Sequence, residues 1–216
     1  MKAYSARNDT AMPLRHRIFL LVSLLLVLLT AACDKTPKIT PLPADAVVLA
    51  FGDSLTHGNG AAEGEAYPEV LAGLLGRTVI NAGVPGEVSA AGLKRLPRLL
   101  EEYRPNLVIV CHGGNDFLQR LDRARTAANL AAMLEQIRGT GADVILVGVP
   151  EFGLILKPPA FYQETADRFG IPYEADIVSD LLGDRDLKSD TIHPNAAGYR
   201  RMAEALHALI KRAHGI

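Results

Sequence analysis

The fold is decided by the stretch Ala46-Val47-Val48-Leu49-Ala50-Phe51-Gly52-Asp53-Ser54-Leu55. Residues 46–51 are apolar without alternation, which is typical of a parallel strand buried on both faces of a sheet. Gly52 and the polar residues after it end this run, so a loop follows the strand. Similar short apolar runs occur at residues 78–81, 107–111 and 143–149, with a weaker one at 172–174.

Longer segments with helical periodicity separate these runs. They cover residues 67–75, a stretch that Ser89 is expected to cap, residues 126–138 and residues 195–213. Strands that alternate with helices predict an α/β fold with a central parallel sheet of about five strands. In such sheets, ligands bind outside the carboxyl ends of the strands. Because Ser54, Gly86 and Asn115 each follow one of the first three runs, we expect them to meet at one edge.

Composition sets the class of protein and excludes one class of partner. The chain has 216 residues, of which 49% are apolar and 22% are charged, with a formal net charge of −1. These values are typical of one globular domain with a substantial core. Lysines and arginines are scattered along the sequence instead of forming a basic face, so nucleic acid is excluded as a partner.

The amino terminus has the pattern of an export signal. Basic residues 15–17 precede the apolar run 18–29, and the small residues 30–32 precede Cys33. We interpret residues 1–32 as a signal peptide, since the apolar run is shorter than the roughly 20 residues that span a bilayer. A membrane anchor that is not cleaved is the alternative. Residues 33–45 contain three prolines and predict an extended tether. The folded domain is then expected at 46–216.

Residues 29–33, Leu-Thr-Ala-Ala-Cys, resemble the lipobox of bacterial lipoproteins. The resemblance implies that Cys33 is lipidated and that the exported protein is anchored in a membrane, facing the periplasm. Cys111 is the second of only two cysteines, so no disulfide framework is expected. It ends an apolar run, which favours a buried, inert thiol over a reactive one.

Three residues supply the groups needed to make a hydroxyl attack an acyl carbon: Ser54, Asp190 and His193. A serine is a weak nucleophile unless a base takes its proton, and a carboxylate must hold that base in the right tautomer. Asp190 precedes His193 by three residues, so one tight turn can aim both side chains the same way. Taken singly, Ser54 and Asp190 are equally typical of helix caps or turns.

Four sequence blocks occur in a fixed order, and together they resemble the SGNH, or GDSL, hydrolase family. They are Gly52-Asp53-Ser54-Leu55, Asn81-Ala82-Gly83-Val84-Pro85-Gly86, Gly113-Gly114-Asn115-Asp116 and Asp190-Thr191-Ile192-His193-Pro194. The likeness spans residues 46–211. It implies a three-layer α/β/α, flavodoxin-like fold. The Gly-x-Ser-x-Gly elbow of the α/β-hydrolases is absent, which argues against that other fold.

The resemblance also assigns roles to the matching positions. It implies that Ser54 is the nucleophile, His193 the general base and Asp190 the carboxylate that orients the histidine. The backbone N–H groups of Ser54 and Gly86 and the side-chain amide of Asn115 would form the oxyanion hole. From the residues alone, Gly86 is also explained as a plain turn residue and Asn115 as a loop asparagine that bonds its own backbone.

Within the family, the chain resembles the bacterial arylesterase, acyl-CoA thioesterase and lysophospholipase group. This implies a serine esterase that hydrolyses short- to medium-chain carboxyl esters through an acyl-enzyme intermediate, with thioesters and lysophospholipids as further substrates. One alternative is an O-acetyl esterase that acts on cell-wall or polysaccharide sugars. Another is a lipid-anchored binding protein without turnover.

Apolar residues in two loops suggest walls for an acyl or aryl group. They are Phe117 and Leu118 after the Asn115 block, and Phe152 and Leu154 after the fourth strand, although a core role explains such residues equally well. No metal or cofactor is expected. His112 is the nearest candidate ligand to Cys111, but adjacent side chains on a strand point to opposite faces.

Overall fold

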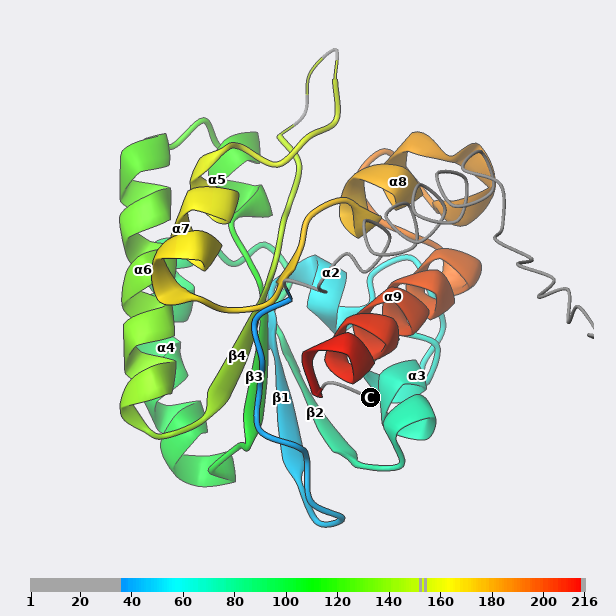
Figure 1. Cartoon of the computed structure of the whole chain (residues 1–216). Coiled ribbons are helices and arrows are strands. Elements are labelled where there is room, and N and C mark those ends of the chain that lie inside the picture. The colour runs from blue at the N-terminus through cyan, green and yellow to red at the C-terminus, as the bar shows by residue number, and fades with distance from the viewer. Residues whose placement is uncertain (1–35, 152, 154, 215–216) are drawn as a thin grey trace, which may run out of the picture. The chain divides into compact units, whose positions relative to one another are not determined.

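The computed structural model describes residues 36–151, 153 and 155–214. They form a central sheet with helices on both faces (Figure 1). All strands are parallel, in the order β2-β1-β3-β4-β5, which is the flavodoxin-like order. The predicted three-layer α/β/α fold with a five-stranded sheet is confirmed. The strands are β1 (Val47–Gly52), β2 (Thr78–Gly83), β3 (Leu107–Cys111), β4 (Asp143–Val147) and β5 (Tyr173–Glu174).

The helices lie in two groups on opposite sides of the sheet (Figure 1). One group consists of α4 (Ser89–Tyr103), α5 (Gly114–Leu118), α6 (Arg123–Gly139) and α7 (Phe161–Phe169). The other consists of α3 (Tyr67–Leu75), α8 (Ile177–Gly183) and α9 (Ala196–His214), with α2 (Ser54–His57) and the 3₁₀ helix η1 (Arg185–Leu187) near the ends of strands. None of the helices in the described residues is both long and apolar enough to cross a bilayer.

The core confirms the continuous apolar pattern of the first and third runs, since residues 48–51 and 107–111 are fully buried. Three buried tyrosines extend from the core to the loops around the strand ends. The hydroxyl of Tyr162 donates to the His112 carbonyl at 2.8 Å, and that of Tyr199 donates to the Asn59 carbonyl at 2.8 Å. The Tyr67 hydroxyl shares a hydrogen bond with the Thr56 hydroxyl at 3.2 Å. Apolar packing and polar anchoring therefore come from the same side chains.

Two glycines let α2 cross the carboxyl ends of the central strands. A Cβ at Gly52 would collide with the Thr56 side chain and the Cys111 carbonyl, and a Cβ at Gly83 would collide with the His57 backbone. Register places Gly52 opposite both Gly83 and Cys111. The backbone of α2 therefore packs against strand ends without an intervening side chain.

The packed unit begins at Thr36, earlier than the boundary at 46 expected from the sequence. Ile39 is 7% exposed and belongs to the core, and its N–H donates to the Ala213 carbonyl at 3.2 Å. The Thr40 N–H donates to the Asp143 carboxylate at 2.7 Å. These contacts lie at the amino end of the sheet, opposite the strand ends that carry Ser54. Residues 36–45 thus lie against the domain, although they lack the periodicity by which sequence indicates packing.

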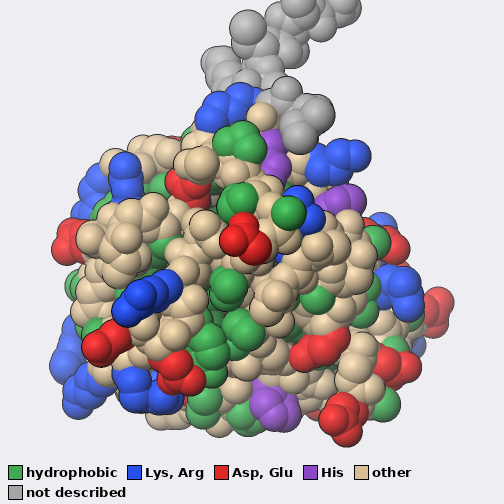
Figure 2. Space-filling model, turned by 90° about the horizontal axis from the view of Figure 1, so that it is seen from below, with side chains coloured by type: hydrophobic (Ala, Val, Ile, Leu, Met, Phe, Trp, Pro, Cys, Tyr) green, Lys and Arg blue, Asp and Glu red, His purple; other side chains and the backbone are tan. Residues whose placement is uncertain are grey.

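The amino end of the sheet presents a surface of mixed charge. Figure 2 shows this end, where Lys and Arg side chains are interspersed with Asp and Glu side chains around small hydrophobic areas. No single sign of charge dominates the face in this view.

Ile39 provides a test of the packing of this amino-terminal segment. We expect Ile39→Ala to lower the free energy of unfolding by about 2 kcal/mol, because it removes a buried branched side chain and leaves a cavity. Urea denaturation followed by circular dichroism measures the change. Ile155→Ala is the matched control, since Ile155 is 71% exposed and its truncation should change stability by less than about 0.5 kcal/mol. Equal stability of the two variants would contradict the packing of this segment.

Candidate active site

Ser54 lies just beyond the carboxyl end of β1, as the first residue of α2. Asp53 caps this helix, with its Oδ1 accepting a hydrogen bond from the Leu55 N–H at 3.1 Å. A carboxylate in this place satisfies a helix N–H that has no partner inside the helix. The strand and the capped helix together fix the backbone of Ser54 at the edge of the sheet.

His193 reaches Ser54 from the loop between η1 and α9. Its Nε2 lies 3.0 Å from the Ser54 Oγ, and its Nδ1 lies 2.8 Å from the Asp190 Oδ2. The other carboxylate oxygen of Asp190 accepts the N–H groups of Ile192 at 2.7 Å and His193 at 2.8 Å. One aspartate therefore shapes the turn and holds the imidazole. The structure thus brings Ser54 together with Asp190 and His193, although His193 lies 139 positions after Ser54 in the sequence.

The environment of Asp190 favours its ionised form. Partial burial raises the pKa of this carboxyl, but the hydrogen bonds from the His193 ring and the two backbone N–H groups outweigh it and hold the pKa below its ordinary value. An ionised Asp190 accepts from Nδ1, so the Nδ1–H tautomer of His193 is favoured. Nε2 is then free to accept the hydroxyl proton of Ser54.

Gly86 lies in a tight turn after β2. The Glu87 N–H donates to the Val84 carbonyl at 3.2 Å, and Gly86 has a φ of 77°. Proline followed by glycine at the central positions is the pattern of a type II turn. A Cβ at Gly86 would meet nothing within 4 Å. Glycine is therefore required here by the backbone angle, and not by the close approach of a neighbouring atom.

Asn115 lies in the first turn of α5, between Glu87 in the turn after β2 and Asp53, the residue before Ser54. Its Nδ2 donates to the Glu87 carbonyl at 3.0 Å and to the Asp53 Oδ2 at 3.2 Å. Burial raises the pKa of Asp53, although the nearby His112 and the Leu55 N–H oppose the shift. The amide of Asn115 is thus oriented from two sides before any substrate is present.

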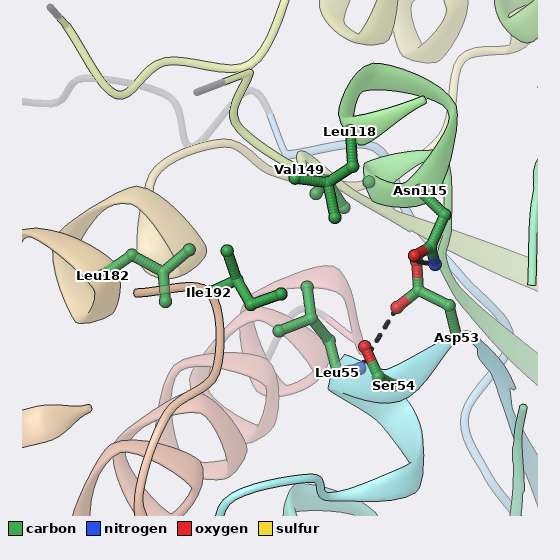
Figure 3. A pocket seen from close by; sticks show the side chains of 9 residues that line it. Asp53, Ser54, Leu55, Asn115, Leu118, Val149, Leu182 and Ile192 are labelled. Carbon is green, nitrogen blue, oxygen red and sulfur yellow. Dashed lines mark hydrogen bonds between the residues drawn. The ribbon is translucent and has the colours of Figure 1, made fainter. Parts of the chain in front are cut away.

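An apolar pocket opens beside these groups (Figure 3). It is small and open to solvent. Ser54 and Asn115 line one side, and the side chains of Leu118, Leu182 and Ile192 extend toward the same space from three different elements. The complete lining is Asp53, Ser54, Leu55, Gly114, Asn115, Leu118, Val149, Leu182 and Ile192. A serine hydroxyl, an amide and an apolar wall thus share one pocket, which is the usual composition of a small-molecule site.

Comparison with known proteins identifies the family. The model of the GDSL-like lipase/acylhydrolase family matches residues 50–201. This chain belongs to that family. Esterase TesA of Pseudomonas aeruginosa is 30% identical over 202 residues, which cover 85% of this chain and 97% of TesA. Thioesterase 1/protease 1/lysophospholipase L1 of Escherichia coli is 30% identical over 156 residues, or 68% of this chain and 75% of that protein.

A solved structure agrees with the fold. The crystal structure of the psychrotrophic esterase EstA from Pseudoalteromonas sp. matches with a TM-score of 0.70 at 24% identity, and the match covers 80% of this chain and 100% of EstA. With the family established, the protein is an enzyme of the GDSL ester-hydrolase class.

Of the residues predicted to form the substrate-binding wall, the structure places one in the pocket and one in the core. Leu118 lines the pocket and is 46% exposed. Phe117 is 8% exposed and packs against Phe161 and Tyr162, with ring centroids 6.2 and 6.4 Å away, so it belongs to the core. Phe152 and Leu154 lie outside the described residues, as does Cys33.

Several residues around the GDSL site were not predicted from the sequence. Val149, Leu182 and Ile192 complete the apolar wall. Ile192 lies inside the Asp190-to-His193 block, and Val149 ends an apolar run, so their positions gave a signal. Leu182 gave none, because α8 is short and follows a segment without clear periodicity.

A buried carboxylate next to Asn115 corrects the expectation for Ser89. Ser89 does not cap α4 from outside, because Val88 occupies that position. Instead, the N–H and hydroxyl of Ser89 donate to Asp116 at 2.7 and 2.5 Å, and the Thr126 hydroxyl donates to the same carboxylate at 3.1 Å. Asp116 is 2% exposed. It therefore joins α4, α5 and α6 directly behind Asn115.

Burial accounts for Cys111, and a local hydrogen bond accounts for His57, the histidine that ends α2. Cys111 is a buried free thiol, and burial raises its pKa well above the ordinary value, which confirms the prediction of a buried, inert side chain. His57 bonds to the Asn59 side chain at 2.9 Å. Within the described part of the chain, no group of three His, Cys, Asp or Glu residues is arranged to hold a metal ion.

Proposed function

We propose that this GDSL hydrolase is a serine esterase that cleaves short- to medium-chain carboxyl esters through an acyl-enzyme intermediate on Ser54. One observation carries the proposal: the Ser54 Oγ lies 3.0 Å from His193 Nε2, while His193 Nδ1 lies 2.8 Å from Asp190. A hydroxyl, a base and an orienting carboxylate in this chain of contacts are what nucleophilic acyl transfer needs.

The first half of the reaction forms the acyl-enzyme. As the Ser54 Oγ bonds to the ester carbon, its proton moves to His193 Nε2 and the carbonyl π electrons move onto the carbonyl oxygen. Asp190 stabilises the imidazolium that results. When the tetrahedral intermediate collapses, the bond to the alcohol oxygen breaks and His193 returns the proton to that oxygen. The alcohol leaves, and the acyl group stays on Ser54.

The oxygen that becomes negative needs hydrogen-bond donors. The N–H groups of Ser54 and Gly86 and the amide of Asn115 are the donors we assign to it, each worth about 3 to 4 kcal/mol of transition-state stabilisation when measured by removal. The Asn115 amide already bonds to Asp53 at 3.2 Å, the longer of its two contacts. We assign the hydrogen of that bond to the substrate oxygen during the reaction.

Water completes the cycle by the same steps in reverse. His193 takes a proton from a water molecule, whose oxygen attacks the acyl carbon, and the same donors hold the second tetrahedral intermediate. His193 then returns the proton to Ser54 as the carboxylic acid leaves. One base therefore serves both halves of the reaction.

The pocket favours an apolar acyl group. Leu55, Leu118, Val149, Leu182 and Ile192 make up its apolar wall, and none of the described residues that line it is Lys or Arg. Burying one methylene group contributes about 0.8 kcal/mol, so such a wall rewards an alkyl chain longer than acetyl. Without a Lys or Arg in the described part of its lining, the pocket offers no cationic side chain to bind the phosphate groups of a substrate such as acyl-CoA. One relative is named a thioesterase and lysophospholipase, so thioesters and lysophospholipids are further substrates to test.

Removal of the nucleophile tests the mechanism. We expect Ser54→Ala to lower kcat for p-nitrophenyl butyrate by about a thousandfold or more, because the covalent route is lost. The rate of p-nitrophenol release, followed by absorbance, measures kcat. A fluorophosphonate probe should label the wild type at Ser54 only. Ser179→Ala is the matched control, since the Ser179 hydroxyl has no hydrogen-bond partner among the described residues. Full activity in Ser54→Ala would disprove the assignment.

A series of esters tests the substrate class separately. With p-nitrophenyl acetate, butyrate, octanoate and palmitate, we expect kcat/KM to rise from acetate to butyrate or octanoate and to fall at palmitate, because the small, open pocket contacts only part of a sixteen-carbon chain. A maximum at acetate, together with release of acetate from acetylated sugars, would instead support the O-acetyl esterase. A rise that continues to palmitate would contradict the chain-length range.

We also propose that the protein is a lipoprotein anchored through Cys33 and facing the periplasm. The basis is the sequence pattern of residues 15–33, which lie outside the described residues. Cys33→Ser should abolish incorporation of labelled palmitate and release the protein from the membrane fraction or block its processing. Cys111→Ala is the control, because the buried Cys111 should leave labelling unchanged. Label retained in Cys33→Ser would exclude lipidation at this residue.

A further inference from the structure

One residue outside the proposed triad, Glu87, is linked through its backbone, its carboxylate or Arg95 to each segment that carries a proposed oxyanion donor. Glu87 directly follows Gly86, and its side chain is 7% exposed. Its Oε1 accepts from Arg95 Nε at 2.9 Å, while its Oε2 accepts from Arg95 Nη2 at 2.6 Å and from His112 Nε2 at 3.2 Å. The backbone carbonyl of the same residue accepts from Asn115 Nδ2 at 3.0 Å. Glu87 thus touches the Gly86 turn and the Asn115 amide at once.

Arg95 extends this contact to the strand that leads to Ser54. Its two-pronged pairing with Glu87 leaves one hydrogen of Nη2, which the Ala82 carbonyl at 3.1 Å and the Gly52 carbonyl at 3.4 Å share. The guanidinium also lies 4.5 Å from the centroid of the Phe51 ring. A planar guanidinium can meet a carboxylate, two carbonyls and a ring simultaneously, which a lysine cannot do. Arg95 thereby holds the ends of β1 and β2 to Glu87.

His112 closes the network from β3. It is fully buried, and its Nδ1 accepts the Gly113 N–H at 2.9 Å. Since Nδ1 accepts, the Nε2 carries the hydrogen that Glu87 accepts. Gly92 of α4 makes room for this ring, because a Cβ there would lie 2.5 Å from His112 Nε2. The imidazole therefore fills the space that Gly92 leaves, and it fixes the backbone at Gly113, two residues before Asn115.

We propose that Glu87 is a positioning residue for the oxyanion hole, which, held by Arg95 and His112, aims the Gly86 N–H and the Asn115 amide at the developing negative oxygen. This inference rests on the proposed esterase function of Ser54. It assigns a role to residues that contact no reacting atom. Their contribution is preorganisation, since donors that are already fixed need not reorient during the reaction.

The electrostatics of the network agree with this role. Burial opposes ionisation of Glu87, but the hydrogen bonds from His112 and Arg95 outweigh it and lower the pKa to about 2. The carboxylate is therefore charged at any pH where the esterase is assayed. An unpaired anion beside an oxyanion hole would repel the charge that forms there, and the guanidinium of Arg95 neutralises it.

The test is the isosteric change Glu87→Gln. Whichever way the new amide is turned, its NH₂ faces at least one donor of Arg95 or His112, so one contact of the network is lost. We expect kcat for p-nitrophenyl butyrate to fall about tenfold or more while KM changes less than about threefold, because the donors act on charge that develops only in the transition state. Glu102→Gln is the matched control. It breaks the exposed Arg98–Glu102 pair on α4, the helix that also carries Arg95, and should leave kcat unchanged.

A double-mutant cycle separates positioning from a purely structural effect. Asn115→Ala removes the donor that Glu87 holds, so Glu87→Gln in that background should lower kcat by less than about threefold. An equal loss in both backgrounds would overturn the proposal, as would wild-type kcat in Glu87→Gln. If Glu87→Gln does not fold, Arg95→Lys enters the same cycle, because a lysine cannot form the fork. An inactive Ser54→Ala beside a fully active Glu87→Gln would refute only this inference, whereas an active Ser54→Ala would refute the proposed function itself.

Discussion

The register of the three central strands is the constraint on which the site depends. Gly52 pairs with Gly83 on one side and with Cys111 on the other, so β1, β2 and β3 end at one level. The loops that carry Ser54, Gly86 and Asn115 therefore start from the same edge. A slip of one strand by a single residue would turn its side chains to the opposite face and separate these loops. Apolar strand packing, which has no chemistry of its own, thus fixes the distances of the polar site.

Polar groups around this edge divide into a buried set and an exposed set. Asp53, Asp116 and the Glu87 side chain are nearly excluded from water, and each has several hydrogen-bond donors. Asp190, in contrast, has a side chain that is 52% exposed. Buried, fully bonded carboxylates rigidify their surroundings, whereas the exposed Asp190 leaves the turn before His193 open to solvent, from which water would enter in the second half of the proposed reaction. The rigid parts thus hold the proposed oxyanion donors, and the accessible part holds the proposed base.

Much of this arrangement follows from the sequence, and the exceptions have physical causes. Continuous apolar runs identify β1 and β3, and strand ends give the shared edge of Ser54, Gly86 and Asn115, because these depend on local pattern and parallel topology. Short helices such as α5 and α8 have too few turns to show periodicity, so the wall residue Leu182 was not predicted. The segment 36–45 packs through Ile39 and backbone hydrogen bonds, which leave no periodic signal. Long-range partnership, such as Ser89 with Asp116, is set by the fold and cannot be read from spacing.

The resting hydrogen bonds of Asn115 show how the site can be rigid and still respond to substrate. Its amide contacts the Glu87 carbonyl at 3.0 Å and the Asp53 carboxylate at 3.2 Å. We infer that the first contact fixes the plane of the amide, because Arg95 and His112 hold Glu87. The second involves a carboxyl whose pKa burial raises, so its charge is disfavoured where it stands. In the proposed mechanism, a substrate oxygen that gains negative charge competes best for the hydrogen held by Asp53 in the transition state. Exchange of that one bond, with the other kept, would make the gain in binding specific to the charge that the proposed reaction creates.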